Sequence, residues 1–120
     1  VEDLGNGLKA LFVLETGINA DTGGFAQSNT AFGRQSYLGL QGNFGTVKLG
    51  RQTTLLYNAL SAIDPFGIGL AGDATRFFNA AGSRMNNTVA YDSPNLSGFQ
   101  GSFQYGFGEV AGNNTAGRNV

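Results

Sequence analysis

The chain has 120 residues with seven basic and eight acidic side chains, so its net charge is −1 and it lacks the basic footprint of a nucleic-acid-binding protein. Glycine is abundant, with 20 residues, and charged residues make up 12% of the chain against about 25% in an average protein. Cysteine and histidine are absent, which excludes disulfides, thiolate chemistry and the familiar catalytic triads, and we therefore predict that the chain is not an enzyme.

The N-terminal part predicts a strand over about residues 7–17. Apolar side chains alternate there with Lys9 and Glu15, which share one face. Residues 2–6 are expected to form a short turn before this strand. The chain begins with Val1-Glu2-Asp3 and shows no basic and apolar leader, so we expect a mature protein or a piece of a larger one.

A loop rich in glycine, asparagine and serine follows at residues 19–30, and two further strands are predicted at about 32–41 and 46–52. The tight link between them, at residues 42–45, is rich in glycine and asparagine. Such a link is typical of a β-hairpin.

Residues 53–82 interrupt the strand pattern. Leu56, Leu60 and Ile63 fall at helical spacing, and a second short helix is predicted from Ala74, with Asp73 as its N-cap. A connection of this length within a compact domain is uncommon and is usually functional.

Strands are predicted again at about 87–93 and 98–107. In the second of these the odd positions read Phe, Gly, Phe, Tyr, Phe and the even positions from 100 read Gln, Ser, Gln, Gly, so one face is aromatic and the other is polar but uncharged. A strand of a transmembrane barrel needs this arrangement, because lipid covers one face and a water-filled lumen covers the other.

The connections between the predicted strands alternate in length. Those at 42–45, at 94–97 and, at the N-terminus, at 2–6 are short, whereas 19–30, 53–82 and the stretch from Gly108 onward are long. Short turns at one end and long loops at the other are the layout of an outer-membrane barrel. We therefore predict an all-β fold, in which residues 1–120 form one partial domain of an antiparallel transmembrane β-barrel. The chain would supply about five strands and the long loop.

Short motifs follow one another along nearly the whole chain, at residues 8–12, 33–40, 44–51, 57–60, 64–67 and 87–94. In their order and spacing they resemble the general diffusion porins of Gram-negative outer membranes, nearest the beta-proteobacterial branch. One departure is that Asp64-Pro65-Phe66-Gly67 stands where the enteric relatives have Pro-Glu-Phe-Gly-Gly, so the acidic residue has moved by one place.

The resemblance implies a water-filled channel for the passive diffusion of ions and small hydrophilic solutes. It also implies that the intact protein has about sixteen strands, lies in the outer membrane among lipid and lipopolysaccharide, and forms a homotrimer. By the same resemblance, residues 53–82 are the third loop, which folds into the barrel and narrows the pore.

In that family, basic side chains on the barrel wall face acidic side chains on the inserted loop and set a field across the water path. The predicted pore residues are Arg51, Arg34, Arg84, Lys48 and Lys9 on the wall, and Asp64 and Asp73 on the loop. Lys48 and Arg51 are three positions apart, so a bulge or bend is required if both are to point inward.

Two other classes of function stay open. One is a soluble glycine-rich β-sandwich that acts as a binding or adhesin module, which would need no detergent. The other is a surface barrel that does not conduct and acts through its external loops. No cofactor is expected, because the formal G-x-G-x-x-G at residues 67–72 follows Asp64-Pro65 and has no βαβ unit around it. No metal site is expected, because the sequence contains no D-x-D-x-D-G calcium loop.

Overall fold

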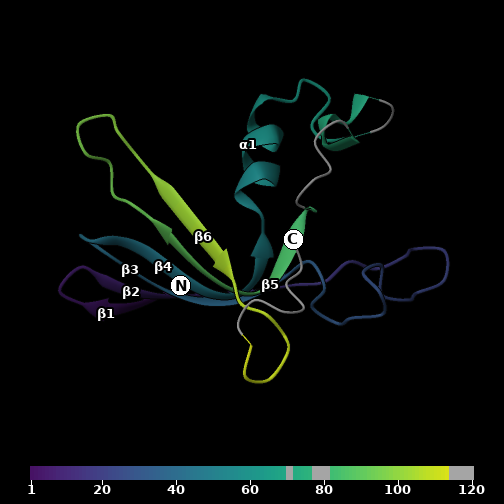
Figure 1. The fold of residues 1–120 in the computed structure, drawn as a ribbon, viewed down its shortest axis with the longest axis horizontal. Helices are drawn as coiled ribbons and strands as arrows, with labels where there is room; N and C mark the ends of the chain where they lie inside the picture. The colour runs from purple at the N-terminus through teal and green to yellow at the C-terminus, as the bar shows by residue number, and fades with distance from the viewer. Residues whose placement is uncertain (70–71, 77–81, 114–120) are drawn as a thin grey trace.

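The structure is a computed structural model that describes residues 1–69, 72–76 and 82–113. Its centre is one antiparallel sheet of six strands that neighbour each other in chain order (Figure 1). The strands are β1 (Glu2–Gly5), β2 (Leu8–Glu15), β3 (Gln35–Gly42), β4 (Gly45–Thr53), β5 (Arg84–Asp92) and β6 (Ser102–Gly106). Between β4 and β5 the chain forms α1 (Leu55–Ile63) and the short 3₁₀ helix η2 (Ala74–Arg76).

The side chains of the sheet alternate between an apolar face and a polar face. One row in register across five strands contains Phe12, Leu38, Leu49, Val89 and Tyr105. The neighbouring row on the opposite face contains Leu11, Gly39, Lys48, Ala90 and Gln104. The predicted alternation of an all-β barrel wall is therefore confirmed.

The apolar face has no cover from the described part of the chain. Phe12 is 61% exposed, Leu38 is 67% exposed and Leu49 is 57% exposed. Among the described residues the buried hydrophobic ones are Leu60 and Ala90, and both belong to the other side of the sheet or to α1. A monomeric soluble protein rarely exposes so continuous an apolar surface.

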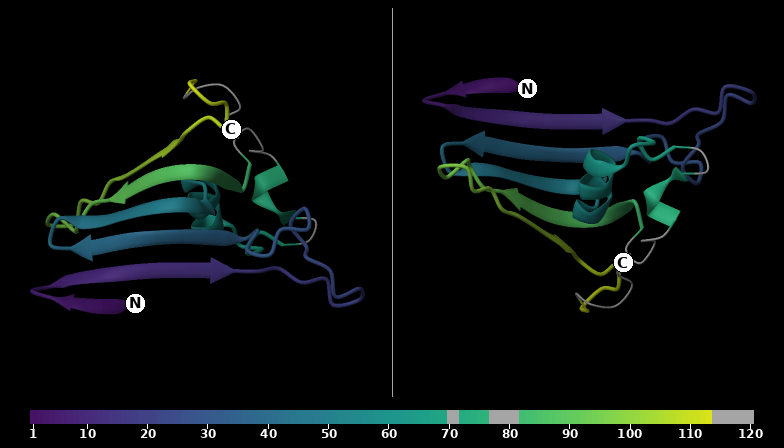
Figure 2. Two further views of the ribbon diagram at one scale, coloured as in Figure 1. Left: turned by 90° about the horizontal axis from the view of Figure 1, so that it is seen from below. Right: turned by 90° about the horizontal axis from the view of Figure 1, so that it is seen from above.

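The short turns gather at one end of the sheet and the long loops at the other (Figure 2). β1–β2 and β3–β4 are joined by two residues each and β5–β6 by the nine residues 93–101, whereas β2–β3 and β4–β5 are joined by the longer stretches 16–34 and 54–83. The alternation in connection length is therefore confirmed. Separately, none of the helices in the described part of the chain is long and apolar enough to cross a membrane.

The number of strands differs from the prediction, because six are present instead of about five. Glu2–Gly5, expected as a turn, is the strand β1 and pairs with β2 through Glu2 and Ala10. All four residues of β1 are exposed, so this strand has no apolar pattern of its own. Its pairing comes from the hairpin turn, where Asn6 and Gly7 both take positive φ as a two-residue turn requires.

Residues 54–83, here called the inserted segment, leave the sheet after β4 and return to it at β5. α1 stands on the concave side of the curved sheet (Figure 1) and lies in front of it in one view and behind it in the opposite view (Figure 2). The helical spacing at 55–63 is confirmed as α1, which Thr54 caps by accepting a hydrogen bond from the N–H of Tyr57. The second predicted helix is present only as η2, and its continuation at residues 77–81 lies outside the described residues.

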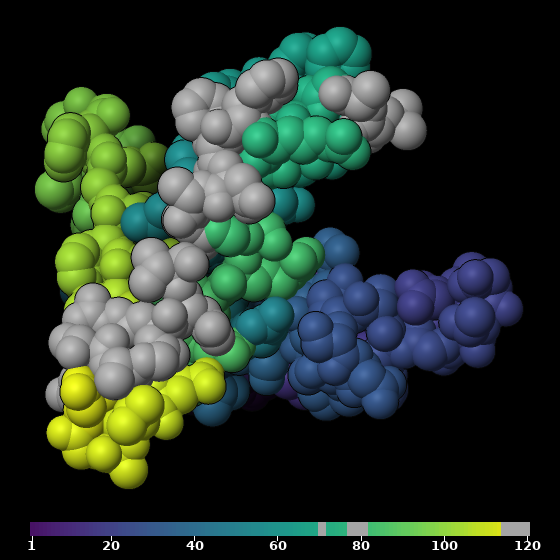
Figure 3. Space-filling view, turned by 45° about the vertical axis from the view of Figure 1, so that its right-hand side comes forward, coloured from purple at the N-terminus to yellow at the C-terminus, as the bar shows by residue number. Residues whose placement is uncertain are grey.

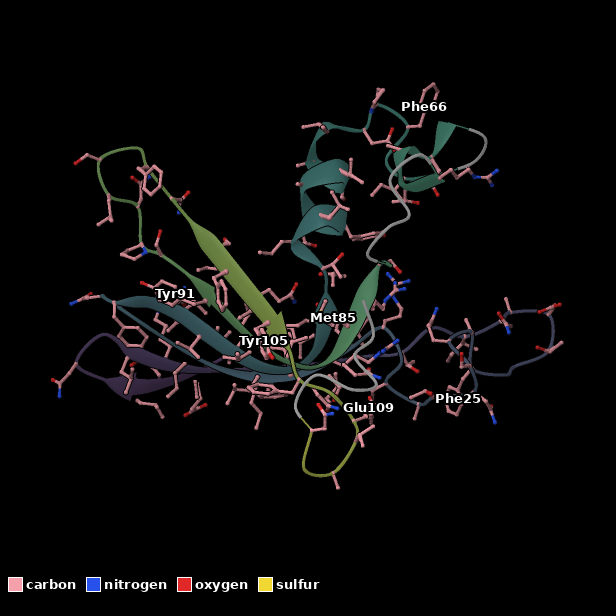
Figure 4. The ribbon with its side chains drawn as sticks, viewed as in Figure 1. Phe25, Phe66, Met85, Tyr91, Tyr105 and Glu109 are labelled. Carbon is pink, nitrogen blue, oxygen red and sulfur yellow. The ribbon has the colours of Figure 1, made fainter. Side chains whose placement is uncertain are left out.

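The remaining long loop joins β2 to β3 and projects away from the sheet, at the right of the space-filling view (Figure 3). Phe25 lies on this loop, whereas Phe66 lies at the far end of the inserted segment, beyond α1 (Figure 4). The two long loops thus extend in different directions. Of these two loops, the inserted segment is the one that stands over the polar face, through α1.

Candidate functional site: the polar wall and the inserted segment

Lys48 lies on the polar face, as alternation predicted, and forms an ion pair with Asp92 of β5. Its Nζ is 2.8 Å from Asp92 Oδ2, and the hydroxyl of Ser102 donates to Asp92 Oδ1 at 2.7 Å. The same Nζ lies 5.9 Å from the centre of the Tyr37 ring, within reach of a cation–π interaction. The charge of Lys48 is therefore balanced within the wall.

Arg34, Arg51 and Arg84, here called the arginine cluster, meet at the end of the sheet that carries the long loops. Arg34 and Arg51 lie close enough to Arg84 for their positive charges to act on it, and Tyr57 of α1 lies near Arg34 and Arg84. Glu15 is the acidic partner, since Arg34 Nε donates to Glu15 Oε1 at 2.5 Å. Three guanidinium groups outnumber the carboxylates of Glu15 and of Glu109, which accepts from the Asn86 amide, so this end of the sheet carries a net positive charge.

Arg51 is held in place from two directions. Its Nε donates to the backbone carbonyl of Gly33 at 2.9 Å, and its Nη1 donates to the side-chain carbonyl of Asn86. These contacts tie β4 to the loop before β3 and to β5. The guanidinium group is suited to this role because its donors form a rigid fork.

A bulge lies beside Arg51, but its extra residue is in β5, so it does not by itself bring Lys48 and Arg51 of β4 onto one face. Gly50 pairs with Thr88, and Gln52, two positions later, pairs with Met85, three positions earlier. Asn87 takes a φ of +50° within the interrupted stretch of β5. The irregularity places Asn86 beside Arg51, where it accepts the hydrogen bond.

Lys9 lies near the short-turn end of β2 and pairs in register with Asp3 and Gln41. Its side chain is exposed. The structure does not bring it near the arginine cluster, because the cluster lies at the opposite end of the strands. Lys9 stays a predicted lumen residue from alternation alone.

Asp64 serves the inserted segment itself. Its carboxylate accepts hydrogen bonds from the backbone N–H groups of Ala74, Phe66 and Ile68, at 3.0, 2.9 and 3.0 Å. These bonds, that of Ala74 first, hold the pKa of Asp64 below its ordinary value of 3.8. The ionised carboxylate therefore folds the turn after α1 back against the start of η2.

Asp73 has a similar local role. Its Oδ1 accepts hydrogen bonds from the backbone N–H of Thr75 at 2.8 Å and from the Thr75 hydroxyl at 2.6 Å. The side chain thus caps η2, as the N-cap prediction required. Both predicted loop acids shape the loop, and the arginine cluster contacts Glu15 of β2 instead.

Four residues of this region were missed as site residues: Glu15, Asp92, Tyr57 and Gln104. Glu15 and Asp92 are strand acids, and their pairing depends on cross-strand register, which alternation within one strand does not give. Gln104 stood out only as part of the uncharged polar face. Tyr57 occupies a helical position whose direction depends on how the inserted segment folds.

The described residues, 1–69, 72–76 and 82–113, contain no group of three or more acidic, histidine or cysteine side chains placed to hold a metal ion. The chemistry that this arrangement offers is electrostatic attraction of anions and hydrogen bonding to solutes.

Comparisons with known proteins agree with this arrangement. The chain is 41% identical over 111 residues to an outer membrane porin protein of Bordetella pertussis, with 88% of this chain and 28% of that protein covered. It is 40% identical over 116 residues to outer membrane porin protein 32 of Delftia acidovorans, with 90% and 32% covered. It is 36% identical over 116 residues to the major outer membrane protein P.IB of Neisseria gonorrhoeae, with 94% and 32% covered.

Among solved structures, the chain is similar to an anion-selective porin from Comamonas acidovorans, with a TM-score of 0.79 and 38% identity over 98% of this chain and 38% of that chain. The chain thus spans about a third of the length of the curated relatives it matches. The family model of Gram-negative porins matches residues 1–120 of the chain. By sequence, by fold and by the placement of its loops, the chain belongs to the Gram-negative porin family.

Proposed function

We propose that this chain is the part of an outer-membrane channel that carries the constriction, and that the intact protein lets ions and small hydrophilic solutes diffuse passively through a water-filled pore. The observation that carries this proposal is the position of α1. It stands over the polar face, while the apolar face on the other side is left exposed. Lipid would cover the apolar face and water would fill the space on the side of α1.

The arginine cluster and the inserted segment would form the narrow part of that pore. Arg34, Arg51 and Arg84 would supply a positive field, and Glu15 would offset part of it. A solved relative is described as an anion-selective porin. We therefore propose that the pore favours anions over cations.

No chemical step is part of this function. The relatives named above are porins, which are channels and not enzymes. The soluble β-sandwich is disfavoured, because such a domain would bury the face that carries Phe12, Leu38 and Leu49. The family also suggests a homotrimer set in lipid and lipopolysaccharide, and the broad apolar surface of β2–β4 is available for either lipid or subunit contact.

Planar-bilayer conductance of the intact parent protein, extracted in detergent and measured under a KCl gradient, tests the proposal. Stepwise and long-lived ohmic openings that close in threes are expected, with a reversal potential on the anion-selective side. A silent bilayer would leave the surface barrel as the better reading. A protein that stays monomeric in solution after detergent removal would favour the β-sandwich.

A further inference from the structure

The two ends of the inserted segment, here called its neck, are joined through Thr54, which is 3% exposed. The N–H of Thr54 donates to the carbonyl of Ser83 at 3.1 Å, and its hydroxyl donates to the carbonyl of Gly82 at 3.0 Å. These bonds join the two ends of the segment to each other. They leave open the direction in which α1 points relative to the wall.

A second set of bonds comes from β6, two strands away from β4 in the sheet. The side-chain amide of Gln104 donates through Nε2 to the carbonyl of Thr53 at 3.1 Å and accepts at Oε1 from the N–H of Leu55 at 3.2 Å. The donor and the acceptor of the amide are therefore both hydrogen-bonded, to the residues before and after Thr54. The N–H of Leu55 is one of the first-turn donors that have no partner within a helix, so the contact also completes the cap of α1.

Gln104 reaches this position because the residue opposite it is small. Ala90 of β5 pairs in register with Gln104 and is 2% exposed. A larger side chain at Ala90 would stand between β6 and the neck. The small side chain of Ala90 and the long side chain of Gln104 therefore act together on the polar face.

We propose that Gln104 is a positioning residue of the channel: its side-chain amide clamps the peptide groups on either side of Thr54 and fixes α1 against the wall. The inference rests on the proposed channel function, since a fixed α1 matters where it defines a pore. Loss of the amide leaves Thr53 and Leu55 open to water of the lumen. The sheet therefore stays folded, while α1 is free to change its tilt.

A distance measurement in the intact parent tests the clamp without depending on conduction. This chain has no cysteine, so Asn43→Cys in the β3–β4 turn and Ser61→Cys on α1 provide two exposed labelling sites within it. Pulsed electron resonance between spin labels at these sites should give a narrow distance distribution. Gln104→Leu should at least double its width, and the control Gln41→Leu, on the polar face at the short-turn end, should leave it unchanged.

Thermal unfolding separates loss of the clamp from loss of the fold. A broadened distribution at an unchanged unfolding temperature supports the proposal, and a distribution that stays narrow in Gln104→Leu overturns it. If Gln104→Leu does not fold, Gln104→Glu is measured instead, because it keeps an acceptor for Leu55 and loses the donor to Thr53. Its distribution decides by the same criterion.

Conductance gives a second measurement, the open-channel current noise, which would not change if Gln104 only stabilised the fold. If the parent conducts, Gln104→Leu should raise the open-channel current noise at an unchanged unfolding temperature. If the parent is silent, the channel function fails, while the distance distribution still decides whether the clamp exists. The two failures are therefore distinguishable.

Discussion

Lys48 and Asp92 neutralise each other across β4 and β5, with 2.8 Å between Nζ and Oδ2. The pair lies on the polar face and is only partly exposed, at 23% for the Lys48 side chain and 35% for that of Asp92. The wall therefore presents a dipole at this position and not a free cation. The arginine cluster, with its excess of positive charge, is the stronger source of field.

Removing Asp92 should expose the charge of Lys48. Asp92→Asn in the intact parent keeps the size of the side chain and is expected to shift the reversal potential toward anions. The double variant Lys48→Met, Asp92→Asn should return it to the parental value, because the removed pair carries no net charge. A double variant that stays at the value of Asp92→Asn would contradict the assignment of the pair to the pore wall.

Arg51→Glu should shift the selectivity of the intact parent toward cations. A unit charge about 5 Å from an ion in water changes the free energy of that ion by about 0.8 kcal/mol, which is about fourfold in local concentration. The substitution changes the charge by two units, so the effect should be clear in dilute KCl, where screening is weak. The readout is the reversal potential under a KCl gradient.

The control for Arg51 is Arg51→Lys, which keeps the charge but cannot make both contacts, to Gly33 and Asn86. It should retain the parental selectivity. An unchanged reversal potential in Arg51→Glu would place Arg51 outside the water path.

The fold of the inserted segment should depend on acid through Asp64. Its pKa is lowered because the ionised carboxylate accepts three backbone N–H groups. The resulting stabilisation is fully present above the ordinary value of 3.8 and is lost as the pH falls through the lowered pKa. The amide chemical shifts of Phe66, Ile68 and Ala74 in the intact protein should titrate together with a midpoint below that value.

Asp64→Asn is the matched control for this titration. It removes the common midpoint and should raise the hydrogen-exchange rate of the same three amides at neutral pH. Independent midpoints at the three amides, or a shared midpoint above 3.8, would speak against the carboxylate as their common acceptor.

A charge on the apolar face should destabilise the protein far more than the same charge on the polar face. Leu38→Arg places a guanidinium at the middle of β3 toward lipid, which costs about 2–4 kcal/mol at the bilayer midplane. Gln41→Arg in the same strand faces the other side and should change the free energy of unfolding little. Urea unfolding of the intact protein refolded in lipid vesicles measures both, and equal effects would contradict the assignment of the two faces.

Much of the sheet can be predicted from the sequence, because apolar and polar side chains alternate along each strand according to the face on which they lie. Residues 98–107 show this best, since aromatic and uncharged polar side chains separate by parity alone. The helical spacing of Leu56, Leu60 and Ile63 likewise gave α1 inside a long connection. The ends of the strands were harder to predict. β6 begins at Ser102 instead of residue 98, because Leu96 and Phe99 form a turn. β5 begins at Arg84 instead of residue 87, because the bulge lets the strand continue past Asn87.

The site was less predictable than the fold, for a physical reason. β1 is recognisable only through its partner, since none of its four residues is buried. The ion pairs of Glu15 and Asp92 follow from register between strands, which one strand does not encode. Asp64 illustrates the opposite difficulty: the sequence predicts a pore charge there, and the hydrogen bonds through which the same carboxylate folds the loop depend on local structure that the sequence pattern does not show.

The linear order of the strands has a consequence for membrane entry. β1 and β6 stand at its two ends, and each has one partner strand within the described part of the chain. The outer edges of β1 and β6 would meet hydrocarbon, where no water can replace a missing hydrogen-bond partner. Each backbone group without a hydrogen bond costs several kcal/mol there. Insertion one hairpin at a time would repeat that penalty at every step. Closure and insertion of the barrel to which this chain belongs should therefore be a single concerted event.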